Sequence, residues 1–318
     1  MDNRKVVIIG DGAVGSTTAY TLMTKENVNE IVIVDINKEK TEGDVLDMVH
    51  GMCFVSPKTI KAGTYDDVKD SQIVIITAGV GQKPGESRID LLKRNMKVFD
   101  SILDGIKPHL DDKMIILVVT NPVDILSYYT YKKLGISSNR VIGSGTVLDS
   151  ARLRFLISEI EGIDTRNIHA YVIGEHGDSE VSAFSSANIA QIPLKQYLDD
   201  VHGCDAKNIM LDLHEKVKNA AYEIISKKGA TFYAIALSTA KIVGTILNNQ
   251  NSVLTVSTYI ESEFNGEVKG VYLSLPCVLG SSGIKKILHI EYSYDEVLKL
   301  IESSKTLKAQ YKELEIEK

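Results

Sequence analysis

Short runs of valine and isoleucine recur through the first half of the chain, separated by segments of helical length. The runs are KVVIIG from Lys5, EIVIVD from Glu30, QIVIITAG from Gln72 and MIILVVTNP from Met114. Because these runs are apolar almost without interruption, they predict strands that are buried on both faces. Helices are expected between them, over residues 14–25, 38–50 and 87–110. Strands that alternate with helices predict an α/β fold with a doubly wound parallel sheet.

The pattern changes after about residue 145. A helix is expected over 147–161, a strand over HAYVIG at 169–174, and long helices between 205 and 248. The runs SVLTVSTYI and GVYLSLPCVLG then show mixed alternation, and an amphipathic helix over 293–314 ends the chain. This order predicts a second, α+β domain. Since 318 residues exceed the usual size of a single core, we expect two domains, residues 1–145 and 146–318.

Charge and cysteine content narrow the class of partner. The net charge of -6 is spread along the chain, so neither nucleic acid nor an anionic membrane is favoured, and a small molecule is the expected partner. Three cysteines without a CxxC pair indicate neither a disulfide framework nor a metal site, and they fit a reducing cytoplasm. Asp11 interrupts the first apolar run too early for a signal peptide, and no segment reaches transmembrane length.

A glycine motif follows the first expected strand. In GDGAVGS, Gly10, Gly12 and Gly15 have the GxGxxG spacing, which allows a tight turn, approach of a pyrophosphate to the backbone, and close packing of helix on strand. Asp35 ends the second strand, where its carboxylate can bind a ribose diol and would repel a 2′-phosphate. The motif therefore predicts a Rossmann-type domain that binds NAD. The alternative is a glycine-rich turn followed by an unrelated aspartate.

A histidine stands between two glycines in the segment GEHGD. Transfer of a hydride between an alcohol carbon and nicotinamide needs a group that takes and returns the hydroxyl proton, and the imidazole of His176 is suited to both near neutral pH. Asp149 in LDSARLR can orient that imidazole, and Arg152 lies one helical turn further on the same face. A guanidinium there can bind a substrate carboxylate with two hydrogen bonds. The alternative for His176 is a purely structural role.

Together, the segments GDGAVGS, TAGVGQKPGESR, VTNPVDI, LDSARLR and GEHGDS resemble the L-lactate and malate dehydrogenase family, in order and spacing, over essentially the whole chain. The resemblance implies that His176 is the proton donor and acceptor, Asp149 its partner and Arg152 the carboxylate anchor. It also implies that Asn121 and Thr231 lie beside the substrate. The cofactor contacts that it implies are Gly10, Gly12, Val14, Gly15, Asp35, Tyr65, Gly79, Thr120, Asn121 and Ser144.

The segment AGVGQKPGESR has the composition of a mobile loop. In the family this loop closes over the substrate and brings in Arg88 to polarise the carbonyl; the alternative for Arg88 is a solvated residue in the first helical turn. At the position of Gln82, lactate-type members of the family have glutamine, as this sequence does, whereas malate-type members have arginine. A second substrate carboxylate would be buried beside Gln82 without a countercharge. Val80 and Gly81 depart from the common loop, a change expected either to loosen the loop or to admit bulkier 2-oxo acids.

The resemblance thus implies an NAD-dependent enzyme of fermentative glycolysis that interconverts pyruvate and L-lactate, with a relaxed L-2-hydroxy acid dehydrogenase or a malate enzyme as the alternative. It also implies a homotetramer. Arg154 and His169 match positions at which many bacterial members bind fructose 1,6-bisphosphate, an allosteric activator, and the alternative is that both are surface residues. A non-catalytic dinucleotide-binding scaffold is a further alternative, which the intact set of His176, Asp149, Arg152 and Arg88 disfavours.

Overall fold

The structure is a computed structural model that describes residues 4–25, 27–81 and 88–316. Within these residues the main sheet has nine strands in the order β14-β13-β12-β6-β5-β4-β1-β2-β3. Six of them form a parallel sheet: β1 (Lys5–Ile9), β2 (Glu30–Val34), β3 (Thr59–Ala62), β4 (Ile73–Ile76), β5 (Ile115–Val118) and β6 (Val141–Gly143). Their order, 3-2-1-4-5-6, is that of a dinucleotide-binding Rossmann fold, as the sequence predicts.

The remaining strands of this sheet are antiparallel and come from the second half of the chain: β12 (Ser252–Ile260), β13 (Val271–Gly280) and β14 (Gly283–Ile287). β12 pairs with β6 through Ser257 and Gly143, so the sheet continues across the expected boundary at residue 145. The division into 1–145 and 146–318 stays a prediction.

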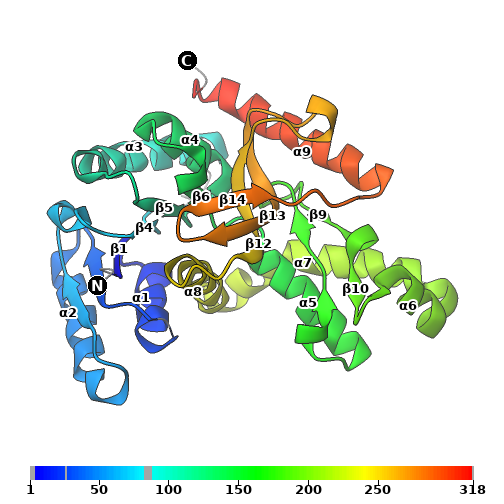
Figure 1. Ribbon diagram of the computed structural model, residues 1–318, viewed down its shortest axis with the longest axis horizontal. Helices are drawn as coiled ribbons and strands as arrows, with labels where there is room; N and C mark the ends of the chain where they lie inside the picture. The colour runs from blue at the N-terminus through cyan, green and yellow to red at the C-terminus, as the bar shows by residue number, and fades with distance from the viewer. Residues whose placement is uncertain (1–3, 26, 82–87, 317–318) are drawn as a thin grey trace.

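Helices cover both faces of the sheet (Figure 1). Their bounds are α1 (Ala13–Lys25), α2 (Lys38–His50), α3 (Arg88–Ile106), α4 (Val123–Leu134), α5 (Val147–Glu161), α6 (Leu194–His202), α7 (Ala206–Lys228), α8 (Tyr233–Leu247) and α9 (Tyr294–Glu313). The expected helix over 87–110 ends early, at Ile106, and a 3-10 turn containing Pro108 follows it. Proline ends the helix because it has no amide hydrogen to donate.

The strands β1, β2, β4 and β5 bury alternate residues in two different cores. Val6 and Ile8 of β1 pack into a core with α1 and α8, whereas Val7 and Ile9 pack into a core with α3, α4 and α9. Burial on both faces is the reason why these strands read as unbroken apolar runs. The second core also contains Tyr272 of β13, so it draws residues from both halves of the chain.

A third core lies under α5, α6 and α7 and belongs to the second half alone (Figure 1). Here the expected single strand at 169–174 is wrong. The structure forms β7 (Ile168–His169), which pairs with β10 (Asn188–Ile189), and β8 (Val172–Ile173), which pairs with β9 (Val181–Ser182). β11 (Ile192–Pro193) completes the sheet of β7 and β10. The chain changes partner between β7 and β8, and an apolar run does not encode its pairing partner.

Among the described residues, no helix is long and apolar enough to cross a membrane.

Candidate active site

The glycine motif forms the turn between β1 and α1. Gly10 has φ +107°, and a Cβ atom built on it would lie 2.5 Å from the backbone nitrogen of Ala78. A Cβ on Gly15 would lie 1.8 Å from the carbonyl oxygen of Gly10, so both glycines are required by packing. A Cβ on Gly12, by contrast, would meet no protein atom within 4 Å. The backbone at Gly12 is therefore open to a ligand, at the positive end of the α1 dipole, as the pyrophosphate of a dinucleotide requires.

Asp35 lies directly after β2, facing this turn. Its Oδ2 accepts the amide hydrogen of Asp11 at 2.7 Å and its Oδ1 accepts that of Asn37 at 2.8 Å. Lys40 in turn contacts the carboxylate of Asp11 at 3.1 Å. The sequence analysis did not assign Asp11 or Lys40 to the cofactor site. Together these contacts hold the Asp35 carboxylate at the mouth of the glycine turn, where a ribose would lie.

The other expected cofactor contacts follow the carboxyl ends of the parallel strands. Gly79 lies after β4 and packs on Thr120, which follows β5: a Cβ on Gly79 would come within 2.6 Å of Thr120 Cγ2. Tyr65 follows β3 and packs over Gly105 of α3, and Ser144 follows β6 with its amide bonded to Val118. Val14 lies in the first turn of α1, and Asn121 is exposed next to Thr120. Ligands of open parallel sheets bind at this edge.

His176 lies in the loop between β8 and β9, and its Nδ1 is 2.6 Å from Oδ2 of Asp149. Asp149 is buried in the first turn of α5, where its other oxygen accepts a hydrogen bond from Arg152 Nη1 at 2.8 Å. The i, i+3 spacing on α5 brings these two side chains together, as predicted. The imidazole is 24% exposed, and no described residue hydrogen-bonds to its Nε2. That nitrogen is therefore available to a substrate.

The electrostatics of the pair keep His176 protonated at neutral pH. Burial disfavours the imidazolium, but the charge and hydrogen bond of Asp149 outweigh burial and raise the pKa of His176 to about 9. Burial likewise disfavours the Asp149 carboxylate, but His176 and Arg152 lower its pKa below the usual value. The pair thus combines a buried carboxylate with an imidazolium that can give up its proton.

Asp124 fixes the backbone of His176, a contact that the sequence analysis missed. This buried side chain, in the first turn of α4, accepts the His176 amide hydrogen at 2.7 Å and the hydroxyl hydrogen of Ser257 in β12. Burial raises the pKa of Asp124 to about 7. The available signal was an acid inside the apolar segment VTNPVDI, since a buried acid requires partners.

The expected substrate residues are described only in part. Arg152 is 13% exposed, and no described residue is hydrogen-bonded to its Nη2, which leaves that nitrogen for a carboxylate. Thr231 lies half-buried between α7 and α8. Gln82 lies outside the described residues, and Arg88 begins α3 but its side chain is not described. The loop leading to Gln82 is tethered by the amide of Val80, which donates to Asn95 at 2.8 Å.

Arg154, one of the two expected activator residues, contacts the two residues that follow the other, His169. Arg154 on α5 donates through Nε to the carbonyl of Ala170 at 3.2 Å and lies over the ring of Tyr171. His169 precedes Ala170 and is exposed at the end of β7. Arg154 also lines a cavity of about 550 Å³ with Arg166 and Lys241. No described contact joins Arg154 to His169 directly.

Comparisons with known proteins show the family of the chain. Residues 4–143 match the family model "lactate/malate dehydrogenase, NAD binding domain", and residues 146–317 match "lactate/malate dehydrogenase, alpha/beta C-terminal domain". The chain is 52% identical to an L-lactate dehydrogenase of Acetivibrio thermocellus, over 98% of each chain. It is 47% identical to L-lactate dehydrogenase 1 of Clostridium acetobutylicum, over 96% of this chain and 97% of that one.

Two solved structures are similar over the whole fold. One is MGS-M5, a lactate dehydrogenase from a Medee basin deep-sea metagenome library, with a TM-score of 0.93 and 41% identity over 99% of this chain and all of the other. The second is the minor L-lactate dehydrogenase of Enterococcus mundtii in a ligand-bound form, with a TM-score of 0.92 and 39% identity over 98% of each chain.

Proposed function

The chain belongs to the lactate/malate dehydrogenase family of NAD-dependent oxidoreductases, and from this premise we propose that it is an L-lactate dehydrogenase that interconverts pyruvate and L-lactate. The observation that carries the proposal is the cluster of His176, Asp149 and Arg152. In it, the proton donor His176 and the carboxylate anchor Arg152 are both hydrogen-bonded to the buried Asp149. Relatives named L-lactate dehydrogenase, which are about half identical to this chain over nearly its full length, support the proposal.

The cofactor fits the residues present: Gly12 leaves the backbone open for the pyrophosphate, and Asp35 is held for the adenosine ribose. Bound NADH supplies the hydride.

Arg152 binds the carboxylate of pyruvate through its unshared Nη2 and thereby orients the carbonyl carbon. Protonated His176 donates from Nε2 to the carbonyl oxygen, and Asp149 stabilises the imidazolium before transfer. In lactate oxidation, neutral His176 takes the hydroxyl proton back. We assign polarisation of the carbonyl to Arg88 and substrate contacts to Asn121 and Thr231.

Gln82 supports the choice of pyruvate over oxaloacetate. A neutral amide leaves the second carboxylate of oxaloacetate without a countercharge, and a buried unpaired charge costs several kcal/mol. The alternative is a relaxed L-2-hydroxy acid or malate dehydrogenase.

A steady-state panel with NADH tests this choice. The measurement is kcat/KM for pyruvate, 2-oxo-4-methylpentanoate and oxaloacetate with the purified enzyme. We expect pyruvate to be preferred over oxaloacetate by at least about a hundredfold, the factor that several kcal/mol implies. A preference for oxaloacetate would overturn the assignment to Gln82, and a preference for the branched acid would indicate the relaxed enzyme.

Assembly and activation form the second part of the proposal. Phe155 on α5 and Leu237 on α8 are about half exposed beside the cavity that Arg154, Arg166 and Lys241 line. Exposed apolar side chains on neighbouring helices are typical of a subunit interface. We propose a homotetramer in which Arg154 and His169 bind fructose 1,6-bisphosphate, in a cytoplasmic enzyme of fermentative glycolysis.

Light scattering and pyruvate saturation curves test this part. We expect a mass of four chains and, with the bisphosphate added, a lower KM for pyruvate than without it. Arg154→Gln removes the guanidinium and should abolish the response while leaving the basal curve in place. Unchanged saturation curves at both pH 6 and pH 7.5 would contradict activation, and a monomer would contradict the assembly.

A further inference from the structure

Glu180 is a buried carboxyl group beside the His176–Asp149 pair that the mechanism above does not use. It lies four residues after His176 and is 6% exposed, and its Oε1 has no hydrogen-bond partner among the described residues. One carboxyl oxygen of Glu180, one ring nitrogen of His176 and one carboxyl oxygen of Asp149 all lie within 4.8 Å of one another. A buried polar atom without a partner costs free energy, so its presence beside the proton-transfer pair calls for an explanation.

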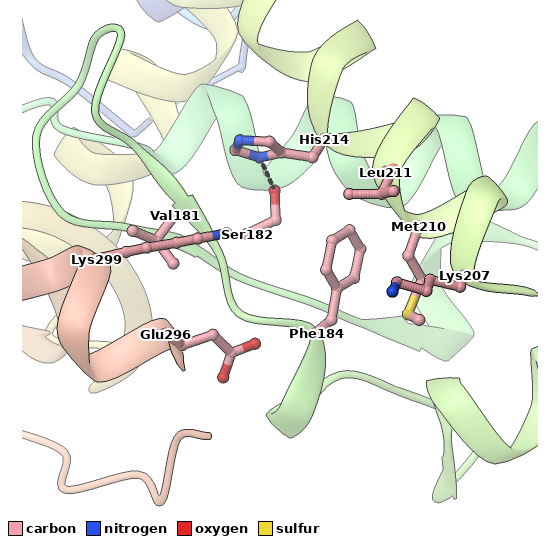
Figure 2. A pocket seen from close by; sticks show the side chains of 9 residues that line it. All are labelled: Val181, Ser182, Phe184, Lys207, Met210, Leu211, His214, Glu296 and Lys299. Carbon is pink, nitrogen blue, oxygen red and sulfur yellow. Dashed lines mark hydrogen bonds between the residues drawn. The ribbon is translucent and has the colours of Figure 1, made fainter. Parts of the chain in front are cut away.

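Contacts on both sides of Glu180 fix the position of its backbone. Its amide donates to the carbonyl of Gly177 at 3.1 Å, and the next two residues form β9, which is buried and pairs with β8. The hydroxyl of Ser182 in β9 lies 3.0 Å from Nδ1 of His214 on α7, as the dashed line in Figure 2 marks. Figure 2 also places the apolar side chains of Val181 and Phe184 beside this contact. The strand that follows Glu180 is therefore anchored on both sides.

The charges around Glu180 favour its neutral form. Burial raises the pKa of Glu180 to about 8, and the negative charge of Asp149 adds to this rise. The positive groups that oppose it are His176 in its own loop, Arg152 on α5 and Lys218 on α7. Two neighbouring carboxyl groups in a buried site cannot both ionise easily, so Asp149 holds the negative charge and Glu180 the proton.

We propose that Glu180 is a positioning residue for proton transfer, a third proton-binding group held against the His176–Asp149 pair so that the acid strength of His176 depends on the charge of Glu180. The inference rests on the proposed role of His176. When Glu180 is neutral, only Asp149 and, more weakly, Asp124 stabilise the imidazolium of His176, which then releases its proton more readily. When Glu180 ionises, its added negative charge stabilises the imidazolium and retains the proton.

The pH profile of Glu180→Gln tests the proposal. Glutamine has the shape of a protonated glutamate, so the fold and NADH binding should be retained, but the added negative charge at alkaline pH is lost. We expect the alkaline limb of kcat/KM for pyruvate reduction, and the acid limb for lactate oxidation, to move to lower pH by about half a unit to one unit. The matched control is Glu302→Gln on α9, an exposed glutamate whose profile should overlay that of the wild type.

A purely structural role predicts a different result: lower activity at every pH with the limbs in place. That result, or an unchanged profile, would overturn the inference. A wild-type enzyme that is inactive with pyruvate would instead overturn the proposed function.

A second measurement does not depend on activity or on the folding of a variant. The measurement is an infrared difference spectrum between pH 7 and pH 9 of wild-type enzyme labelled with ¹³C-glutamate. We expect the carbonyl band of a protonated, buried glutamate at pH 7, and we expect this band to be lost at pH 9. Absence of that signal would overturn the inference.

Discussion

Asp149→Asn is the most informative single substitution in the site, because it removes the charge that holds the proton on His176 and leaves the side chain's shape. With Asp149 the pKa of His176 is about 9 against an ordinary 6.5, a difference of about 2.5 units, or about 3 kcal/mol in favour of the imidazolium. Without that charge the pKa of His176 should fall toward its ordinary value, because burial of the ring remains and only the weaker effects of Asp124 and Glu180 oppose it.

The fall in pKa sets the size of the effect. At pH 7.5 nearly all wild-type His176 is protonated, whereas at the ordinary pKa only about a tenth would be, so protonation alone costs about tenfold in kcat/KM for pyruvate. At pH 6 the cost should be at most a few-fold. The assay is steady-state pyruvate reduction from about pH 5.5 to pH 10, with NADH fluorescence as the control for cofactor binding. An equal loss at every pH would refute the reasoning, because it would mean that Asp149 does not hold the proton.

Four further outcomes are expected. Gly12→Ala should raise the Kd for NADH at least about tenfold with little loss of stability, because its Cβ meets no protein atom but occupies the approach of the pyrophosphate. Gly15→Ala should lower the free energy of unfolding by at least about 2 kcal/mol, because its Cβ would lie 1.8 Å from a carbonyl oxygen. Gln82→Arg should shift the ratio of kcat/KM toward oxaloacetate by about a hundredfold. As the pH rises through about 9, pyruvate reduction should fall and lactate oxidation should rise, because His176 must be protonated for one and neutral for the other.

Each outcome has its own check. For Gly12→Ala and Gly15→Ala, titration with NADH measures cofactor binding and urea unfolding measures stability, which separates the two roles of these glycines. Equal destabilisation by both substitutions would contradict the assignment of Gly12 to cofactor binding. An unaltered substrate ratio in Gln82→Arg would mean that this position does not contact the substrate's tail. Parallel pH profiles in the two reaction directions would argue against proton exchange at His176.

Four strands of the Rossmann sheet, β1, β2, β4 and β5, could be predicted because each is buried on both faces and therefore reads as an unbroken apolar run. The edge strand β3 and the short strand β6 were not predicted, because β3 is partly exposed and polar in sequence and β6 has only three residues. The helix α5 could be predicted over its observed range, Val147–Glu161. The partners of β7 and β8 could not be predicted, since pairing is decided by contacts between distant segments. For the same reason the sequence did not reveal that β12 would extend the parallel sheet at β6.

The site divides in a similar way. The sequence could predict the set His176, Asp149 and Arg152, because helical spacing and the chemistry of proton transfer constrain these residues. The family resemblance also placed them in one site. Asp124 and Glu180 were missed because their roles depend on burial and on a backbone amide, which residue identity does not reveal. Gln82 and the side chain of Arg88 remain predictions.

The central claim is that His176 transfers the proton and that the cofactor binds elsewhere, at the glycine turn. His176→Ala tests it most directly when NADH binding and pyruvate turnover are measured on the same preparation. The account predicts that NADH binds with nearly wild-type affinity while kcat for pyruvate falls by at least about a hundredfold. Turnover close to that of the wild type, or loss of NADH binding, would contradict it.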